Sequence, residues 1–143
     1  MKRILLILCG FISLSTLTQT HSQTIILDLG SEGKLEVMKE DLGKMTWWDA
    51  LEACDKLNTA EDRLHSEWHI PTKKEMTILF ENKDKIGGFK DDVYWTGEQV
   101  ISQNAAWVMY VENGFLTDGY NSAETVYRYH HYVRAVRYIP PRY

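Results

Sequence analysis

The chain has 143 residues and a formal net charge of −4 at pH 7, and aromatic side chains make up 12% of it. A chain of this length forms one domain with a hydrophobic core of its own. Its acidic balance argues against nucleic acid and anionic membranes as partners.

The N-terminus has the composition of a targeting segment. A positively charged start precedes an apolar run over residues 4–17 and then a short polar stretch. This order is typical of a secretory signal peptide, and the run is shorter than the roughly 20 residues that a membrane-spanning helix needs. We therefore expect a signal peptide at 1–22, a single exported domain at 23–143 and no stable membrane span. The domain would function in the periplasm, at the cell surface or outside the cell.

The first elements of the expected domain are strands. Residues 24–29 and 34–38 are short apolar or alternating segments on either side of the turn sequence Gly-Ser-Glu-Gly, and they predict a hairpin. A polar connection follows at 39–44. The next segment changes to helical periodicity.

Thr46 and Asp49 have the spacing of a capping box, and apolar side chains then recur every three or four residues. This pattern predicts an amphipathic helix over 47–58. Cys54 lies on its apolar stripe, and this position favours a buried thiol over a reactive one, while an intermolecular link stays open. Because the other cysteine, Cys9, lies in the signal peptide, no internal disulfide is expected.

A second helix begins after the sequence Trp-His-Ile-Pro-Thr at 68–72. Pro71 favours an extended residue before it, and Thr72 and Glu75 again have capping-box spacing. The pattern predicts a helix over 73–82, and a Gly-Gly pair ends this region of the chain.

The remaining elements are strands. Short apolar segments predict strands at 93–96 and 105–111, and the sequence Glu-Asn-Gly at 112–114 predicts a hairpin with a type I′ turn. The return strand is expected at 115–119, and a final strand at 132–138. The first and last strands are both apolar enough to pair with each other, and this pairing would join the two ends of the domain.

Five short motifs together resemble a known family. They are Thr-Trp-Trp-Asp-Ala at 46–50, Trp-His-Ile-Pro-Thr at 68–72, Tyr-Trp-Thr at 94–96, Ala-Trp-Val at 106–108 and Val-Arg-Ala-Val-Arg at 133–137. The set resembles the C-terminal domain of Legionella collagen-like protein, and the Fibrobacter major paralogous domain is similar. The resemblance implies an α+β, C-type-lectin-like fold, with two helices packed on a twisted antiparallel sheet and paired termini. It also implies an exported or surface-associated bacterial protein that binds glycans or proteins, with no established reaction.

The chain departs from this family pattern in two informative places. The final strand of the family often carries a cysteine where this chain has Ala135, so the usual partner of Cys54 is missing. The Glu-Pro-Asn and Trp-Asn-Asp signatures of calcium-dependent sugar-binding lectins are absent as well. We therefore expect binding that does not depend on calcium.

The histidines and paired acids do not match a catalytic or metal-binding pattern. His65 and His69 lie four residues apart, but a zincin helix requires Glu directly after the first histidine, and here Ser follows it. The acidic pairs at 61–62 and 91–92 lack the alternating oxygen ligands of a calcium loop. We expect no metal, no cofactor and no catalytic residue, and we interpret the acidic pairs as solvated loop charge.

The best candidate for recognition is the loop before the final strand, because it combines flat rings with hydrogen-bonding groups. Its candidate ligand-binding residues are Tyr120, Asn121, Tyr127, Arg128, Tyr129, His130 and His131. Four tryptophans are expected in the core, at positions 47, 68, 95 and 107, whereas Trp48 lies off the apolar stripe.

The sequence therefore predicts an exported, non-catalytic binding module for a glycan or a protein. Two other functions stay open. One is a glycan-active hydrolase with a carboxylate pair built from loops, and the other is a structural subunit of a surface assembly.

Overall fold

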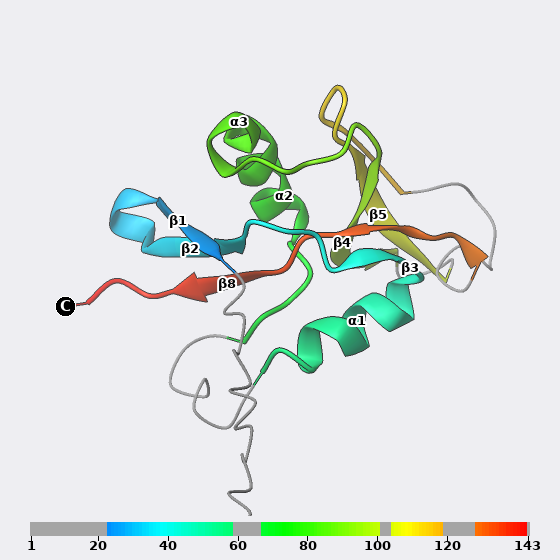
Figure 1. Ribbon diagram of the computed structural model, residues 1–143, viewed down its shortest axis with the longest axis horizontal. Helices are drawn as coiled ribbons and strands as arrows, with labels where there is room; N and C mark the ends of the chain where they lie inside the picture. Colours follow the sequence, from blue (N-terminus) through cyan, green and yellow to red (C-terminus); the bar gives the residue numbers. More distant parts are fainter. Residues whose placement is uncertain (1–22, 59–66, 101–103, 119–127, 143) are drawn as a thin grey trace, which may run out of the picture.

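The computed structural model describes residues 23–58, 67–100, 104–118 and 128–142 (Figure 1). It is an α+β structure with two sheets and three α-helices in the described part of the chain. In chain order the elements are β1 (Thr24–Asp28), the 3-10 turn η1 (Gly30–Glu32), β2 (Lys34–Met38), β3 (Gly43–Met45), α1 (Trp47–Asp55), α2 (Lys73–Glu81), α3 (Lys83–Ile86), β4 (Val93–Val100), β5 (Ala105–Tyr110), β6 (Phe115–Thr117), β7 (His131–Val133) and β8 (Val136–Ile139).

The smaller sheet has the strand order β1-β2-β8, with antiparallel pairing throughout. The predicted N-terminal hairpin is confirmed as β1 and β2. The final strand β8 pairs with β2, not with β1 as expected, so β1 forms an outer edge of this sheet (Figure 1). The sheet still brings the first and last strands of the described chain together.

The larger sheet has the order β3-β7-β4-β5-β6. The expectation of an antiparallel sheet is wrong at one place, because β4 and β7 are parallel, with Tyr94 opposite Tyr132. The expected single strand at 132–138 is also wrong. It is divided into β7 and β8, which belong to different sheets.

The division falls at Arg134 and Ala135, both fully buried. The Arg134 guanidinium donates from Nε to Asp41 (2.7 Å) and from Nη1 to the carbonyl oxygens of Met38, Lys39 and Gly87 (2.8–3.1 Å). A buried charge is tolerated when it is paired and hydrogen-bonded in this way. The arginine therefore fixes the point at which the chain passes from one sheet to the other.

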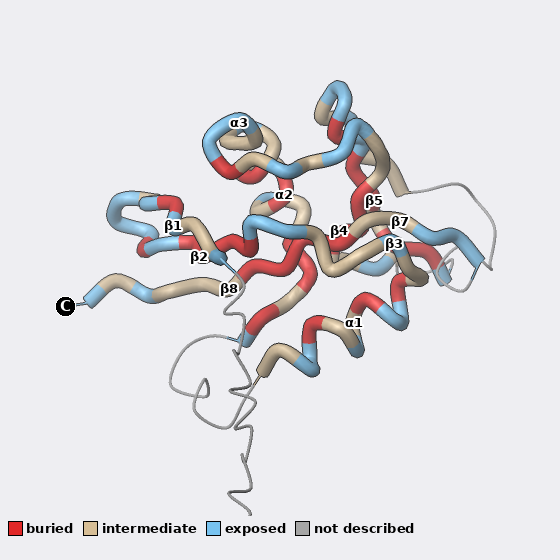
Figure 2. The backbone as a smooth tube through the Cα atoms, viewed as in Figure 1, coloured by how far each residue is buried: buried red, intermediate tan, exposed pale blue. Residues whose placement is uncertain are grey.

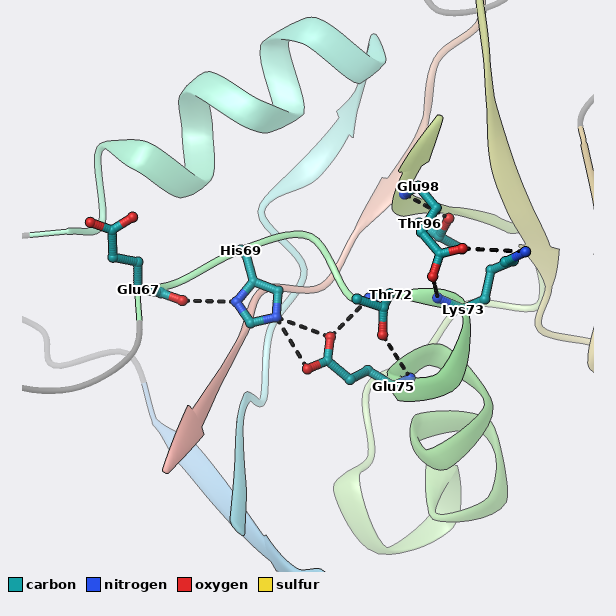
Figure 3. A network of polar contacts seen from close by, with 7 residues as sticks. All are labelled: Glu67, His69, Thr72, Lys73, Glu75, Thr96 and Glu98. Carbon is teal, nitrogen blue, oxygen red and sulfur yellow. Dashed lines mark hydrogen bonds and ion pairs between the residues drawn. The ribbon is translucent and has the colours of Figure 1, made fainter. Parts of the chain in front are cut away.

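Both predicted long helices are present, and their N-terminal caps are as expected. The Thr46 hydroxyl accepts a hydrogen bond from the Asp49 N–H at the start of α1. Thr72 and Glu75 form a complete capping box at the start of α2, visible in Figure 3. Helix α1 ends at Asp55, three residues before the predicted end. The short helix α3 and the short strand β3 were not predicted.

The core consists of two clusters of buried side chains, shown in red along the chain in Figure 2. One joins α1 to the larger sheet and contains three tryptophans, at positions 47, 68 and 95, together with Cys54 and Ala135. The other contains Met76 and Leu79 of α2 with apolar residues of both sheets. Trp107 was expected in the core but is only partly buried on β5, where the Lys73 ammonium lies 4.1 Å from its ring centroid.

The β5–β6 hairpin is present, but its turn is not type I′. Only Gly114 has a positive φ there (75°), whereas a type I′ turn needs a positive φ at two consecutive residues. Tyr110 pairs with Phe115, and the Gly114 N–H donates to the Tyr110 carbonyl oxygen (2.8 Å). The turn is therefore a longer loop that ends in a left-handed glycine.

None of the helices in the described part of the chain is long and apolar enough to span a membrane. The expected signal peptide at 1–22 lies outside the described residues, so the division into signal and domain remains a prediction.

Candidate ligand-binding surface

Residues 128–130 of the predicted recognition loop lead directly into β7, beside β3. Met45 pairs with His131 and Lys44 pairs with Tyr132 across these two strands. Strand β4 lies on the other side of β7. Three strands from distant parts of the sequence therefore support this end of the loop.

The aromatic rings at this place form a stack that rests on the core. The Trp95 indole is completely buried, and its Nε1–H donates to the Met45 carbonyl oxygen (2.8 Å). The His131 ring packs against Trp95 with a centroid distance of 4.6 Å, and Tyr129 lies parallel to His131 at 6.2 Å and 7°. The Tyr129 side chain is 44% exposed. We call these three rings the Tyr129 platform; its lowest ring is fixed, and its outermost ring faces solvent.

One ion pair lies close to the platform. Lys44 Nζ contacts Asp92 Oδ2 at 2.8 Å, and the same ammonium lies 5.2 Å from the Tyr132 ring centroid. The pair raises the pKa of Lys44 and lowers that of Asp92 through their mutual hydrogen bond. Because Lys44 and Tyr132 are the strand neighbours of Met45 and His131, this ion pair and the Tyr132 ring lie on the opposite face of the sheet from the His131 ring.

The His131 imidazole is neutral at physiological pH. Burial lowers its pKa to about 4, and the positive charge of Lys44 acts in the same direction. Asp92 opposes this shift but is outweighed. Because the ring is uncharged and partly buried, it acts as a flat apolar support for Tyr129.

The structure describes four of the seven candidate ligand-binding residues. It brings Tyr129 and His131 together, and it places His130 beside them, with the His130 ring nitrogen Nδ1 3.2 Å from the Arg128 carbonyl oxygen. Arg128, Tyr129 and His130 are exposed. The remaining three, Tyr120, Asn121 and Tyr127, lie outside the described residues.

Sequence reasoning did not predict the contact between Lys44 and Asp92. Asp92 was interpreted as solvated loop charge, yet it pairs with a lysine 48 positions earlier in the chain. No local pattern predicts this contact. Trp48, which the sequence left unassigned, is 43% exposed at the start of α1 and packs edge-on against Trp47 with a centroid distance of 5.1 Å.

His69 participates in a structural network instead of a metal site (Figure 3). Its Nε2 contacts the Glu75 carboxylate (3.0 Å) and its Nδ1 contacts the Glu67 carbonyl oxygen (2.8 Å). Its suggested partner, His65, lies outside the described residues. Among the described residues, no group of three or more His, Cys, Asp or Glu side chains is placed to hold a metal ion.

The thiol of Cys54, the cysteine that lies outside the expected signal peptide, has low reactivity. Cys54 is a free thiol, only 3% exposed, and burial raises its pKa to about 12. The thiolate, which is the reactive form, is therefore scarce at neutral pH. The preference for a buried cysteine on the apolar stripe of α1 is confirmed.

Comparison with protein families gives one match. The family described as the Lcl C-terminal domain, where Lcl is the Legionella collagen-like protein, matches residues 18–137. The chain belongs to this family. Membership indicates a binding domain associated with the bacterial surface, without specifying its partner. No curated protein matches this Lcl C-terminal domain in sequence.

Proposed function

We propose that this Lcl C-terminal domain is an exported, non-catalytic module that binds a glycan through the Tyr129 platform, without calcium. One observation carries the proposal: a half-exposed tyrosine ring lies parallel to a neutral histidine, which packs on a buried tryptophan. A ring held in this way offers contact area with little loss of conformational entropy, and its face can stack on the apolar face of a sugar.

Calcium independence rests on the missing calcium signatures in the sequence, and export rests on the signal-like residues 1–22. A C-type-lectin-like relationship, shared with the Fibrobacter domain, fits the two long helices and the pairing of the last strand with the N-terminal hairpin. The absence of catalysis is supported by the inert Cys54 thiol and by the pairing of Asp92 with Lys44.

A glycan array followed by titration calorimetry tests this function on the secreted protein. Tyr129→Ala is expected to weaken binding about tenfold or more, since an aromatic contact contributes about 0.5–1.5 kcal/mol beyond its buried area. Phe115→Ala is the matched control, because Phe115 is also an exposed ring (60%) but lies on the β5–β6 hairpin. Affinity should be the same with and without EDTA.

Three results would contradict the proposal. Equal glycan affinities for Tyr129→Ala and the wild type would exclude the platform as the binding site. Binding of a protein but of no glycan would change the ligand class. Turnover of a bound glycan, lost on replacement of a carboxylate, would make the domain a hydrolase.

A further inference from the structure

Strand β1 presents an open edge. It is the outermost strand of the smaller sheet, and none of the residues in the described ranges pairs with its outer side. The Lys39 N–H donates to the Gln23 carbonyl oxygen, and the Leu29 N–H donates to that of Gly33. Since hydrogen-bonded pairs alternate along an antiparallel ladder, the backbone groups of Thr24, Ile26 and Asp28 point away from β2.

This edge lacks the usual protection against pairing. Its sequence, Thr-Ile-Ile-Leu-Asp, contains neither lysine nor proline, and its central outward residue Ile26 is 50% exposed. The strand is regular, because each of its five residues has a partner in an unbroken register with β2. A regular, apolar open edge of this kind is a template for another strand.

We infer that β1 pairs with β1 of a second copy, antiparallel about a two-fold axis at Ile26, so that the two small sheets become one sheet of six strands. The edge is self-complementary in this register. Ile26 lies opposite the partner's Ile26, and Thr24 lies opposite the partner's Asp28. By symmetry, Asp28 lies opposite the partner's Thr24. Each of these three pairs brings together residues whose backbone groups point outward, so the full set of exposed donors and acceptors is satisfied.

The side chains favour the same register. Thr24, whose hydroxyl already donates to Glu36, sets a neutral side chain opposite the partner's Asp28, and no like charges are directly opposed. A shift of two residues would set the charged Asp28 against Ile26 and leave Thr24 without a partner in the strand. A shift of one residue would align outward-pointing backbone groups with groups that already bond to β2.

Cysteine substitutions in the chain that begins at Gln23 test this register. At Ile26→Cys the two Cα atoms would be about 5.5 Å apart, a separation that a disulfide spans. At Thr24→Cys, on the same face of the same strand, the two thiols would be separated by roughly 13 Å. Mild oxidation should cross-link Ile26→Cys at least tenfold faster than Thr24→Cys, because only the thiols at position 26 are within disulfide reach. The wild-type Cys54 is buried in both variants.

Sedimentation equilibrium provides the second measurement. The wild type should dimerise, Ile26→Val should do the same, and Ile26→Lys should raise the dissociation constant at least tenfold by opposing two ammonium groups. Circular dichroism confirms that each variant is folded. A wild type that stays monomeric up to millimolar concentration, a dimer unaffected by Ile26→Lys, or equal cross-linking rates at positions 24 and 26 would overturn the inference.

Discussion

His131 shows how the environment sets the chemistry of one residue. In the sequence, His131 is a polar candidate for ligand binding next to His130. In the structure its ring packs on Trp95 and lies near the Lys44 ammonium. Its pKa of about 4 is below the ordinary value of 6.5. The unfolded chain therefore binds more protons than the folded chain between these two pH values, and the folded state loses stability as pH falls through this range.

Replacement of His131 by Phe is expected to remove this acid sensitivity. The wild type should lose up to about 3 kcal/mol of unfolding free energy between pH 6.5 and 4, at 1.36 kcal/mol per pKa unit. His131→Phe keeps a flat ring against Trp95 but cannot bind a proton. Urea unfolding at pH 7 and pH 4.5 measures both proteins, and equal losses on acidification would show that other groups are responsible.

His69, which is paired with Glu75, has a raised pKa, whereas the pKa of His131 is lowered. Its contribution to the free energy of unfolding therefore has the opposite pH dependence. Burial disfavours the charged His69, but the hydrogen bonds that its ring donates to the Glu75 carboxylate and to the Glu67 carbonyl oxygen outweigh it and raise the His69 pKa. Burial likewise disfavours the charged Glu75, yet its bonds to His69 and Thr72 lower its pKa. The pair therefore stabilises the fold most between the ordinary pKa values of Glu and His.

Glu75→Gln tests this pair. The difference in unfolding free energy between wild type and variant should be largest near pH 5.5, on the order of 1 kcal/mol, because the His69 side chain is 36% exposed and screened by solvent. It should decrease as pH rises through the raised His69 pKa. Urea titrations at pH 5.5 and 8.5 give this difference, and a difference that grows at the higher pH would refute the assignment.

At the scale of elements, the sequence predicted what local signals specify. The caps at Thr46 and Thr72 and the alternating N-terminal segments were sufficient for the two long helices and the first hairpin. Strand β3 and the division of the last strand were missed, because each depends on a partner far along the chain. The candidate surface was found only in part for the same reason, since Met45 and Trp95 meet His131 through tertiary structure.

Two adjacent glycines allow a sharp test of one such long-range contact. Gly87 and Gly88 both have positive φ, 77° and 73°. A Cβ at Gly87 would meet nothing within 4 Å, whereas one at Gly88 would lie 2.8 Å from the Lys39 carbonyl oxygen. Gly87→Ala should thus cost only the strain of a positive φ combined with an extended ψ (170°), about 1–3 kcal/mol. Gly88→Ala should add the backbone clash to the strain of its own positive φ, and this clash costs about 1–3 kcal/mol.

Thermal or urea unfolding of the two variants measures these costs. The same residue is introduced at neighbouring positions with nearly the same positive φ, and only the one at Gly88 meets the Lys39 carbonyl oxygen, so a larger loss there reports that contact. Equal destabilisation would mean that the Gly88 segment and the 38–41 segment move apart at little cost.

At the scale of the molecule, Cys54 on α1 and Ala135 before β8 belong to the same buried cluster. The family resemblance implies cysteines at both positions, whereas this chain has Ala135 at the second. The buried indoles at positions 47, 68 and 95 fill the cluster that such a cross-link would otherwise tie together.

Ala135→Cys is expected to restore the cross-link when the protein is oxidised. A disulfide closing a loop of about 80 residues would raise the unfolding free energy by up to about 4 kcal/mol. Thiol titration and mass spectrometry report whether the bond forms, and Cys54→Ala with Ala135→Cys is the control that cannot form it. Two persistent free thiols under oxidising conditions would show that the positions are not within disulfide reach.

The order of strands in the small sheet also determines how the domain carries mechanical load. Thr24, the first residue of β1, pairs with Met38 at one end of β2. Ile139, the last residue of β8, pairs with Lys34 at the other end of β2. Tension between Thr24 and Ile139 would therefore slide β1 and β8 past β2 along the strand axis and load all the ladder bonds simultaneously. A pulling force between these two residues would therefore meet the small sheet in shear, where several ladder bonds must break together.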